Sequence, residues 1–346
     1  MRRPTIADIA RRAGVSKGAV SYALNDRPGV SPLTRQRILA IAEEIGWRPN
    51  SAARALSGAA ANAIGLAIRR PARILGIEPF FMELVSGMEG VLSEAGSALM
   101  LQVVGDAETE LSLYRRWWGE RRIDGAIVVD LRADDPRVGL LQELALPAVI
   151  VGGPTGVGTL PHVWADEAVT VTETVGYLAA LGHRRIGRVA GLPELLHTRH
   201  RDTAFRAAGG TFGVDTSEVI STDYTGDEGA RATRTMLCGA SRPTAILYDN
   251  DIMAVAGLSV AHEMGLVVPR DLSIVAWDDS PLCQVVRPPL TALTRDIPAY
   301  GARAAALLLE VIAEAVGGEA RRAKRRGVEV AHPRLTPRGS TAPPLA

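Results

Sequence analysis

Cysteines and long apolar segments are both scarce in this chain of 346 residues. Its two cysteines, Cys238 and Cys283, cannot build a disulfide-rich scaffold or a cysteine-based zinc site, so a reducing compartment is the simplest setting. No apolar run approaches the roughly 18 residues that a membrane-spanning helix needs, and the first residues contain no apolar signal-peptide core. We therefore expect a cytoplasmic protein without a membrane partner.

The composition is that of a folded protein, but its charge is unevenly distributed. Apolar residues make up 47% and charged residues 22%, which excludes disorder or a fibre as a description of the whole chain. Residues 1–57 carry ten basic and four acidic side chains, so the overall charge of +1 divides into +6 for this segment and −5 for the rest. A basic head on an acidic body indicates that the head binds a polyanion, although an uneven solvated surface would look the same.

The first 50 residues contain the start and stop signals of three short helices. Thr5, followed three residues later by Asp8, resembles a capping box, and Gly14 can end the first helix in a left-handed conformation. Ser16 can cap a second helix, and Ser31 precedes a proline at the first position of a third. Two helices joined by a tight glycine turn form a helix-turn-helix unit, whose second helix fits the major groove of DNA.

The exposed side of that second helix supplies candidate base contacts. Val20 falls on its apolar side, and the opposite side presents Lys17, Gly18, Ser21 and Tyr22. A three-helix bundle with a basic surface and no DNA role is the alternative. Residues 50–58 then form a candidate helix of about two turns, which is marginal on its own in water and could equally be an alanine-rich linker.

From residue 61 onward, short β-rich runs alternate with amphipathic helical stretches. Such alternation is typical of doubly wound parallel sheets, and there are too many units for one sheet, so we expect two α/β lobes. Ligands of such folds bind beyond the carboxyl ends of the strands. Strand candidates span residues 63–68, 98–104, 125–129, 148–151, 185–190, 244–247 and 272–277.

The segments 5–16, 20–25, 30–31 and 46–50 together resemble the DNA-binding domain of the LacI/GalR family of bacterial repressors, almost without gaps across residues 5–58. The resemblance implies that Lys17, Gly18, Ser21 and Tyr22 face bases, although Gly18 has no side chain where relatives usually read a base. It further implies a hinge helix that orders on operator DNA in a dimer, with Leu56 wedged into the minor groove. The remaining DNA contacts that it implies are Thr5, Ser16, Asn25, Ser31, Thr34, Asn50 and Ala53.

The acidic body resembles the effector-binding core of the same family, which is similar to periplasmic sugar-binding proteins. The resemblance rests on segments that include 78–81, 122–125, 181–186, 199–201, 242–246, 249–254, 272–279, 288–291 and 338–341. It implies a helix-turn-helix domain over residues 1–49, a hinge over 50–60 and a core over 61–346. In that core, lobe 1 spans about 61–162 and 292–326, and lobe 2 spans about 163–291 and 327–346.

Six residues follow from those segments as candidate effector contacts. Asn250 and Asp278 end strands and can bind hydroxyls, and Arg199 offers a rigid fork of donors, unless it merely pairs with Asp278. Phe80 and Tyr224 could stack on the apolar face of a sugar. Arg295 stands where relatives often carry a neutral polar residue, which indicates an acidic or differently shaped ligand, or an ion pair with an aspartate.

The sequence contains little that indicates catalysis. Residues 152–158 are glycine-rich but lack the helix that a phosphate-binding loop needs, and Arg199 would repel a metal ion from Glu194, His197 and His200. We therefore expect no enzyme, no cofactor and no metal. The prediction is a homodimeric repressor that binds a palindromic operator under the control of a small molecule, a sugar or glycoside. The alternatives are a free-standing sugar-binding protein and a nucleotide-dependent α/β enzyme.

Overall fold

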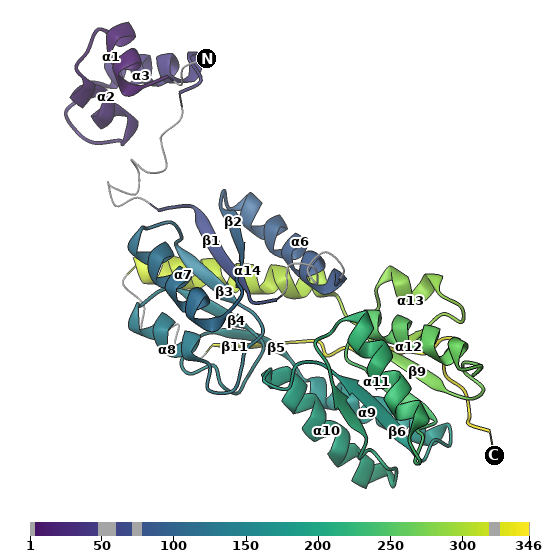
Figure 1. Cartoon of the computed structure of the whole chain (residues 1–346). Coiled ribbons are helices and arrows are strands. Elements are labelled where there is room, and N and C mark those ends of the chain that lie inside the picture. Colours follow the sequence, from purple (N-terminus) through teal and green to yellow (C-terminus); the bar gives the residue numbers. More distant parts are fainter. Residues whose placement is uncertain (1–3, 48–59, 71–77, 318–325, 346) are drawn as a thin grey trace. The chain divides into compact units, whose positions relative to one another are not determined.

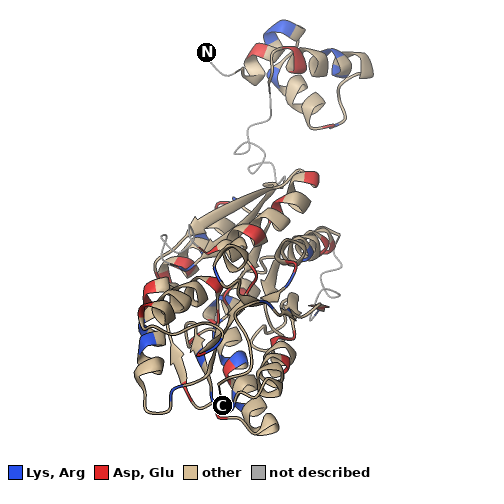
Figure 2. Ribbon diagram, turned by 90° about the vertical axis from the view of Figure 1, so that its right-hand side faces the viewer, with Lys and Arg blue, Asp and Glu red and all other residues tan. Residues whose placement is uncertain are grey.

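The computed structural model describes residues 4–47, 60–70, 78–317 and 326–345, which divide into two compact units at Ala61 and Asn62 (Figure 1). We call the first unit the headpiece and the second the core. Figure 2 marks the charged residues, which lie on the helices of the headpiece and throughout the core. Within the described residues, no helix combines the length and the apolarity needed to cross a membrane.

The headpiece consists of α1 (Ile6–Ala13), α2 (Lys17–Leu24) and α3 (Pro32–Glu44), which confirms the predicted helices. The Asp8 carboxylate accepts hydrogen bonds from the backbone N–H and the hydroxyl of Thr5, at 3.0 and 2.6 Å. The Ser16 hydroxyl caps α2, and Gly14 ends α1 with φ at 62°. Side chains of Ile9, Ala10, Ala13, Val20, Ala23, Ile38 and Ala42 are buried together, and the alanines let the helices approach closely.

The core begins with a parallel six-stranded sheet in the order β11-β5-β4-β3-β1-β2. Its strands are β1 (Ala63–Ile68), β2 (Ala98–Val103), β3 (Gly125–Val128), β4 (Ala148–Val151), β5 (His162–Ala165) and β11 (Gly327–Val330). The helices that follow these strands in the chain, or return to them, are α6 (Pro79–Glu94), α7 (Ala107–Gly119), α8 (Pro136–Glu143) and α14 (Ile297–Val316). Buried clusters that include residues of the strands and of these helices form the core of this first lobe.

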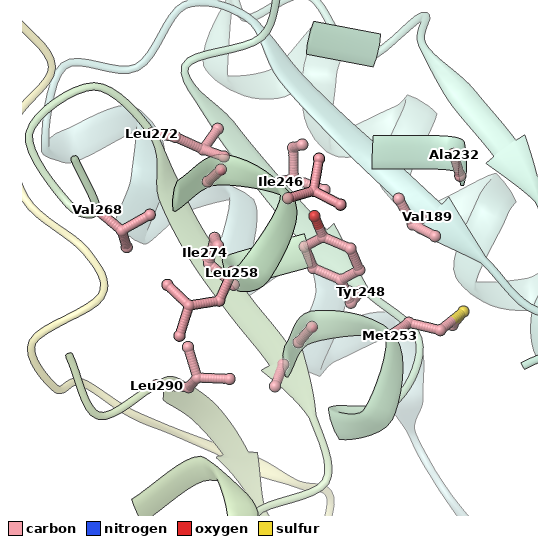
Figure 3. Close-up of a cluster of buried hydrophobic side chains, with 14 of the residues drawn as sticks. Val189, Ala232, Ile246, Tyr248, Met253, Leu258, Val268, Leu272, Ile274 and Leu290 are labelled. Carbon is pink, nitrogen blue, oxygen red and sulfur yellow. The ribbon is translucent and has the colours of Figure 1, made fainter. Parts of the chain in front are cut away.

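A second six-stranded sheet has the order β12-β10-β9-β8-β6-β7, with only the β10–β12 pair antiparallel. Its strands are β6 (Ile186–Ala190), β7 (Val219–Ser221), β8 (Ala245–Tyr248), β9 (Ser273–Trp277), β10 (Thr291–Thr294) and β12 (Arg334–Thr336). Its helices are α9 (Glu167–Ala180), α10 (Leu196–Phe212), α11 (Gly226–Cys238), α12 (Asp251–Glu263) and α13 (Pro281–Val285). Figure 3 shows one of its apolar clusters, in which the Tyr248 ring lies among Val189, Ile246 and Met253.

The two doubly wound lobes were predicted, but three strands lie in the other lobe from the one expected. β5 pairs with β4 and so belongs wholly to the first lobe, although the second was expected to begin at 163. β10 pairs with β9 in the second lobe, whereas the first was expected to resume at 292. β11 pairs with β5, whereas residues from 327 were expected in the second lobe. Backbone hydrogen bonding decides which sheet each strand joins, and strands of only four residues carry little sequence signal for their partner.

Candidate functional site

The exposed side of α2 is the candidate DNA-binding surface of the headpiece. Lys17 and Gly18 are exposed, Tyr22 is 46% exposed, and Ser21 lies partly buried between them. Val20 and Ala23 point the other way and are buried. The predicted base-reading residues therefore share a face that takes no part in packing, as a helix inserted into a groove requires.

The candidate phosphate contacts of the headpiece cluster at helix ends. Ser16 and Ser31 cap α2 and α3, and the Ser31 hydroxyl donates to Thr34 Oγ1 at 2.9 Å. Asn25 follows α2 and donates its side-chain amide to the Ser21 carbonyl oxygen at 2.8 Å. Helix N-termini attract anions because their backbone N–H groups point outward. Thr5 caps α1, whereas Asn50, Ala53 and Leu56 lie outside the described residues.

A cavity opens where strands of both core sheets end, with an empty volume of about 590 Å³ when the solvent at its mouth is included, and we call it the main cavity. The first sheet contributes residues that directly follow β3 and β4, and the second contributes residues that directly follow β8 and β9. This is the position expected for a ligand of a doubly wound fold. Its lining comprises Arg70, Glu78, Phe80, Val129, Asp130, Val151, Gly152, Glu167, His197, Arg201, Tyr224, Asp249, Asp278, Arg295 and Tyr300.

Four predicted effector contacts, Phe80, Tyr224, Asp278 and Arg295, line the main cavity, but Arg199 does not. Arg199 is exposed on α10, and its Nε donates to the Pro193 carbonyl oxygen at 2.9 Å. Helical geometry explains this position. Residues four apart share a helix face, so His197 and Arg201 both face the cavity, while a residue midway between them points away.

Arg201 is therefore the arginine of α10 that reaches the cavity. It donates two hydrogen bonds to Glu167, at 2.7 and 2.8 Å, and its guanidinium lies 3.6 Å from the centre of the Trp277 ring. Burial acts to raise the pKa of Glu167, but the charge and hydrogen bonds of Arg201 outweigh it and lower that pKa to about 2. The Glu167 carboxylate and the Arg201 guanidinium thus remain a charged pair over the whole physiological range.

Arg295 pairs with Asp278. An ion pair with an aspartate was one of the two explanations that the sequence offered for the charge of Arg295. Its Nε lies 2.9 Å from Asp278 Oδ1, and a second contact to Glu167 measures 3.5 Å. The guanidinium also lies 4.9 Å from the centre of the Phe80 ring. Asp278 consequently has a structural partner, but that partner is Arg295 rather than Arg199.

Asn250 takes a structural position that the sequence did not predict. It caps α12: its Oδ1 accepts from the backbone N–H of Met253 at 2.8 Å, and its Nδ2 donates to the carbonyl oxygen of Tyr224 at 3.0 Å. Its side chain is 2% exposed and lines a smaller neighbouring cavity instead of the main one. Asn250 therefore orients Tyr224.

Tyr224 is held rigidly in the cavity wall. Its hydroxyl contacts His197 Nε2 at 2.8 Å and Thr198 Oγ1 at 3.1 Å, and a Cβ at Gly191 would overlap its ring. Burial lowers the pKa of His197 to about 4, and the charge of Arg201 acts in the same direction, so the imidazole is neutral. Both Tyr224 and Asp278 adopt left-handed backbone angles, with φ at 71° and 64°, and such angles cluster at ligand sites.

Arg70 and Asp130 are cavity residues that the sequence reasoning missed. Arg70 donates to both Asp130 oxygens, at 2.7 and 3.2 Å, and its guanidinium lies 4.4 Å from the centre of the Tyr224 ring. Burial acts to raise the pKa of Asp130, but Arg70 outweighs it and lowers that pKa to about 2. Their positions just after strands β1 and β3 could have identified them, because residues that follow the strands of a parallel sheet converge at one edge.

Two domain models match this chain. The model for bacterial regulatory proteins of the lacI family matches residues 5–50, and that for a periplasmic binding protein-like domain matches residues 175–341. The chain is 31% identical to the HTH-type transcriptional regulator CelR of Thermobifida fusca over 315 residues, which is 90% of this chain and 92% of that protein. It is also 31% identical to catabolite control protein A of Priestia megaterium, covering 88% of this chain and 91% of the relative.

Solved structures agree with these matches. A LacI family transcriptional regulator from Bifidobacterium animalis subsp. lactis superimposes with a TM-score of 0.74 at 35% identity, covering 83% of this chain and 100% of that one. A complex of the transcriptional regulator CelR with cellobiose gives a TM-score of 0.73 at 28% identity and covers 98% of this chain and 100% of that one. The chain belongs to the LacI family of bacterial transcriptional regulators.

Proposed function

We propose that this protein is a homodimeric repressor that binds a palindromic operator in the bacterial cytoplasm and changes its affinity when a carbohydrate occupies the main cavity. One observation carries the proposal: a helix face free of packing and a polar, aromatic-lined cavity occur in one chain. Together these two features match a regulator that couples DNA binding to a small molecule. The protein acts by binding, without catalysing a reaction on its effector.

The proposed DNA contacts follow from the exposed side of α2 and the helix ends of the headpiece. Lys17, Ser21 and Tyr22 read base edges, while Gly18 lets the backbone approach the groove without a side chain. Thr5, Ser16, Asn25, Ser31 and Thr34 bind the phosphate backbone, which fixes the register of α2. Residues 50–60 are the proposed hinge between a DNA-binding domain over 1–49 and the core. In this hinge, Asn50 and Ala53 contact DNA and Leu56 enters the minor groove.

The chemistry of the main cavity supports a carbohydrate effector. Three arginines and five carboxylates line it, so it offers both donors and acceptors to the hydroxyls of a sugar. Phe80 and Tyr300 offer aromatic surface for the apolar face of a ring. An adjoining cavity shares Gly152, Glu167 and His197 with the main one and adds Trp164, an aromatic surface on which a second sugar ring could stack.

The lining also supports a coupling mechanism. Arg70, Phe80 and Asp130 come from the first lobe, and Arg201, Tyr224 and Asp278 come from the second, so a ligand that contacts both sets stabilises one arrangement of the lobes. The chain passes between the lobes at β5–α9, β10–α14 and β11–β12. To move operator occupancy from 1:99 to 99:1, the effector needs about 5.5 kcal/mol of preference for one arrangement.

Selection of operator sequences from random DNA, followed by a sugar screen in a gel-shift assay, tests this proposal. We expect a palindromic consensus and a sugar that changes the apparent Kd of the selected site. Lys17→Ala should weaken specific binding, whereas Arg206→Ala, which removes an exposed arginine of the core, should not. Binding of a sugar without preference for any DNA sequence would instead favour the free-standing sugar-binding protein.

A further inference from the structure

A smaller cavity of about 350 Å³ adjoins the main one, and we call it the acidic side cavity. The two cavities share Glu78, Phe80, Asp278 and Arg295, so a single ligand can extend from one into the other. The other lining residues are Pro79, Glu83, Asn250, Asp251, Asp279, Ser280 and Ile297.

Two buried carboxylate oxygens in this side cavity have no hydrogen-bond partner among the described protein residues. They are Oε2 of Glu78, a residue 7% exposed, and Oδ2 of Asp251, a residue 2% exposed. A buried carboxylate oxygen without a donor is unfavourable because it has lost water and gained nothing. Such a pair of oxygens in the wall of a ligand cavity indicates that the ligand supplies the missing donors.

The charges that face the side cavity do not balance. Asp278 is paired with Arg295, and Asp279 with Arg338, whose guanidinium approaches it to 2.7 and 2.5 Å. In the part of the chain that the structure describes, Glu78, Glu83 and Asp251 have no arginine, lysine or histidine at ion-pair distance. The charge of Arg70 acts on Glu78, but its guanidinium is paired with Asp130 and stacks on Tyr224.

The titration of the unpaired acids agrees with this geometry. Burial raises the pKa of Glu78 to about 7, although the nearby charge of Arg70 partly opposes the shift. Burial likewise raises the pKa of Asp251 to about 6, and the hydroxyl of Ser280 partly opposes it. Both carboxyls thus lack the positive charge that would stabilise their ionised forms.

The donor set favours an organic ammonium over a metal ion. Among the described residues, no group of three or more histidine, cysteine or carboxylate side chains is arranged to hold a metal. An ammonium group carries several N–H donors that can reach separate carboxylates. The apolar walls formed by Pro79, Phe80 and Ile297 suit the carbon skeleton attached to it.

We propose that the acidic side cavity binds a protonated amino group of the effector, between Glu78 and Asp251, while the hydroxylated part of the same molecule occupies the main cavity. The effector is accordingly an amino sugar or a related polyhydroxylated amine. This inference rests on the proposed effector role of the main cavity and narrows the chemical class of its ligand.

Isothermal titration calorimetry on the full chain at pH 7 tests the proposal with matched sugars. The probes are glucosamine, galactosamine and mannosamine, each compared with its amine-free hexose and with its N-acetylated derivative. We expect at least one hexosamine to bind, and to bind more tightly than both of its counterparts by about tenfold or more, because only it carries a charged donor. Absence of binding by all three, or equal binding of a counterpart, overturns the proposal.

Two charge-neutralising variants locate the amine. Glu78→Gln and Asp251→Asn should each weaken the hexosamine by about tenfold and leave its amine-free counterpart within about twofold. Glu94→Gln, which changes an exposed carboxyl on the same helix as Phe80, is the control and should change neither. Full hexosamine affinity in both cavity variants would contradict the assignment. The proposed function is judged separately by operator selection, so a protein that selects a palindrome but ignores hexosamines loses only this inference.

Discussion

The headpiece and the core expose their proposed functional groups in opposite ways. In the headpiece, Lys17 and Tyr22 stand on the exposed side of a helix whose packing uses other residues. In the core, the functional groups are themselves buried: Arg70, Arg201 and Tyr224 are each at most 5% exposed. Side chains on the headpiece surface can therefore change with little effect on folding, whereas changes in the cavity alter ligand binding and stability together.

The difference follows from what each region binds. DNA is a large polyanion that a protein grips from outside, where water screens the charges and single contacts are weak. A small molecule must be surrounded, which places arginines and carboxylates in a region of low dielectric where pairing decides their energy. The four predictions below separate the two cases, beginning with the largest effect.

Salt should weaken operator binding severely and effector binding hardly at all. For about six to ten phosphate contacts, raising the salt from about 50 to 200 mM should lower operator affinity by roughly 10³–10⁵. The cavity contacts are largely buried, so we expect effector affinity to change by less than about threefold. Fluorescence anisotropy with labelled operator and calorimetry with the effector measure the two slopes. Similar slopes would show that effector binding depends on screened, exposed charges as strongly as operator binding does.

Arg201→Ala should destabilise the core by about 3–5 kcal/mol, because Glu167 would remain buried without its bidentate partner. The control is Arg199→Ala two residues away, whose exposed side chain contacts a carbonyl oxygen, and it should change the free energy of unfolding by less than about 0.5 kcal/mol. Urea denaturation followed by circular dichroism measures both. Effector response, tested in the same pair, should be lost with Arg201 and kept with Arg199; the reverse would restore Arg199 to the cavity.

The pH dependence of stability should reveal Glu78. Its pKa is about 7 in the folded state against 4.5 for an ordinary glutamate, so the folded state binds the proton more tightly. The stability that this proton confers is complete below pH 4.5 and is lost as the pH rises through 7. Glu78→Gln keeps a neutral side chain at every pH, so its advantage over the natural protein should grow by about 2.5 kcal/mol between pH 5 and pH 8.

The difference in unfolding free energy between the two proteins cancels the contributions of the other titrating groups of the cavity. His197, with its pKa lowered to about 4, destabilises the fold as the pH falls through the range from 6.5 to 4. Asp130 and Glu167, with pKa values near 2, lose their contribution only at still lower pH. These effects are common to both proteins. A difference that stays constant from pH 5 to pH 8 would mean that Glu78 is ionised throughout.

Gly18→Ala should give the smallest change, a gain of about 0.5–1 kcal/mol in headpiece stability. A Cβ at this position would meet only Ser16 Oγ at 3.7 Å, and alanine favours a helix more than glycine does. Thermal unfolding of the full chain, with the headpiece transition followed separately, provides the measurement. Reduced operator affinity in the stabilised variant would show that the groove needs the space left by glycine; unchanged affinity would show that it does not.

Most of the fold was predictable because it depends on local signals. Caps at Thr5, Ser16 and Ser31 marked the headpiece helices, and alternating strand and helix periods marked two doubly wound lobes. The strands β5, β10 and β11 lie in the other lobe from the one predicted, because four residues carry little information about which sheet they join. In the cavity, strand ends predict the position of Asp278, whereas the helical periodicity of residues 197–201 places Arg201 and not Arg199 on the inward face.

The amino-acid sequence alone determined the order of the two units, the exposed side of α2 and the presence of a ligand cavity at the strand ends. Each of these depends on residues close together in the chain, whose periodicity and capping chemistry fix the local structure. Tertiary structure alone decided which charges meet: Arg295 with Asp278, Arg201 with Glu167, Arg70 with Asp130, and Glu78 with none among the described residues. Pairing in a buried site depends on distances of a few ångströms between segments far apart in sequence, and no local pattern encodes those distances.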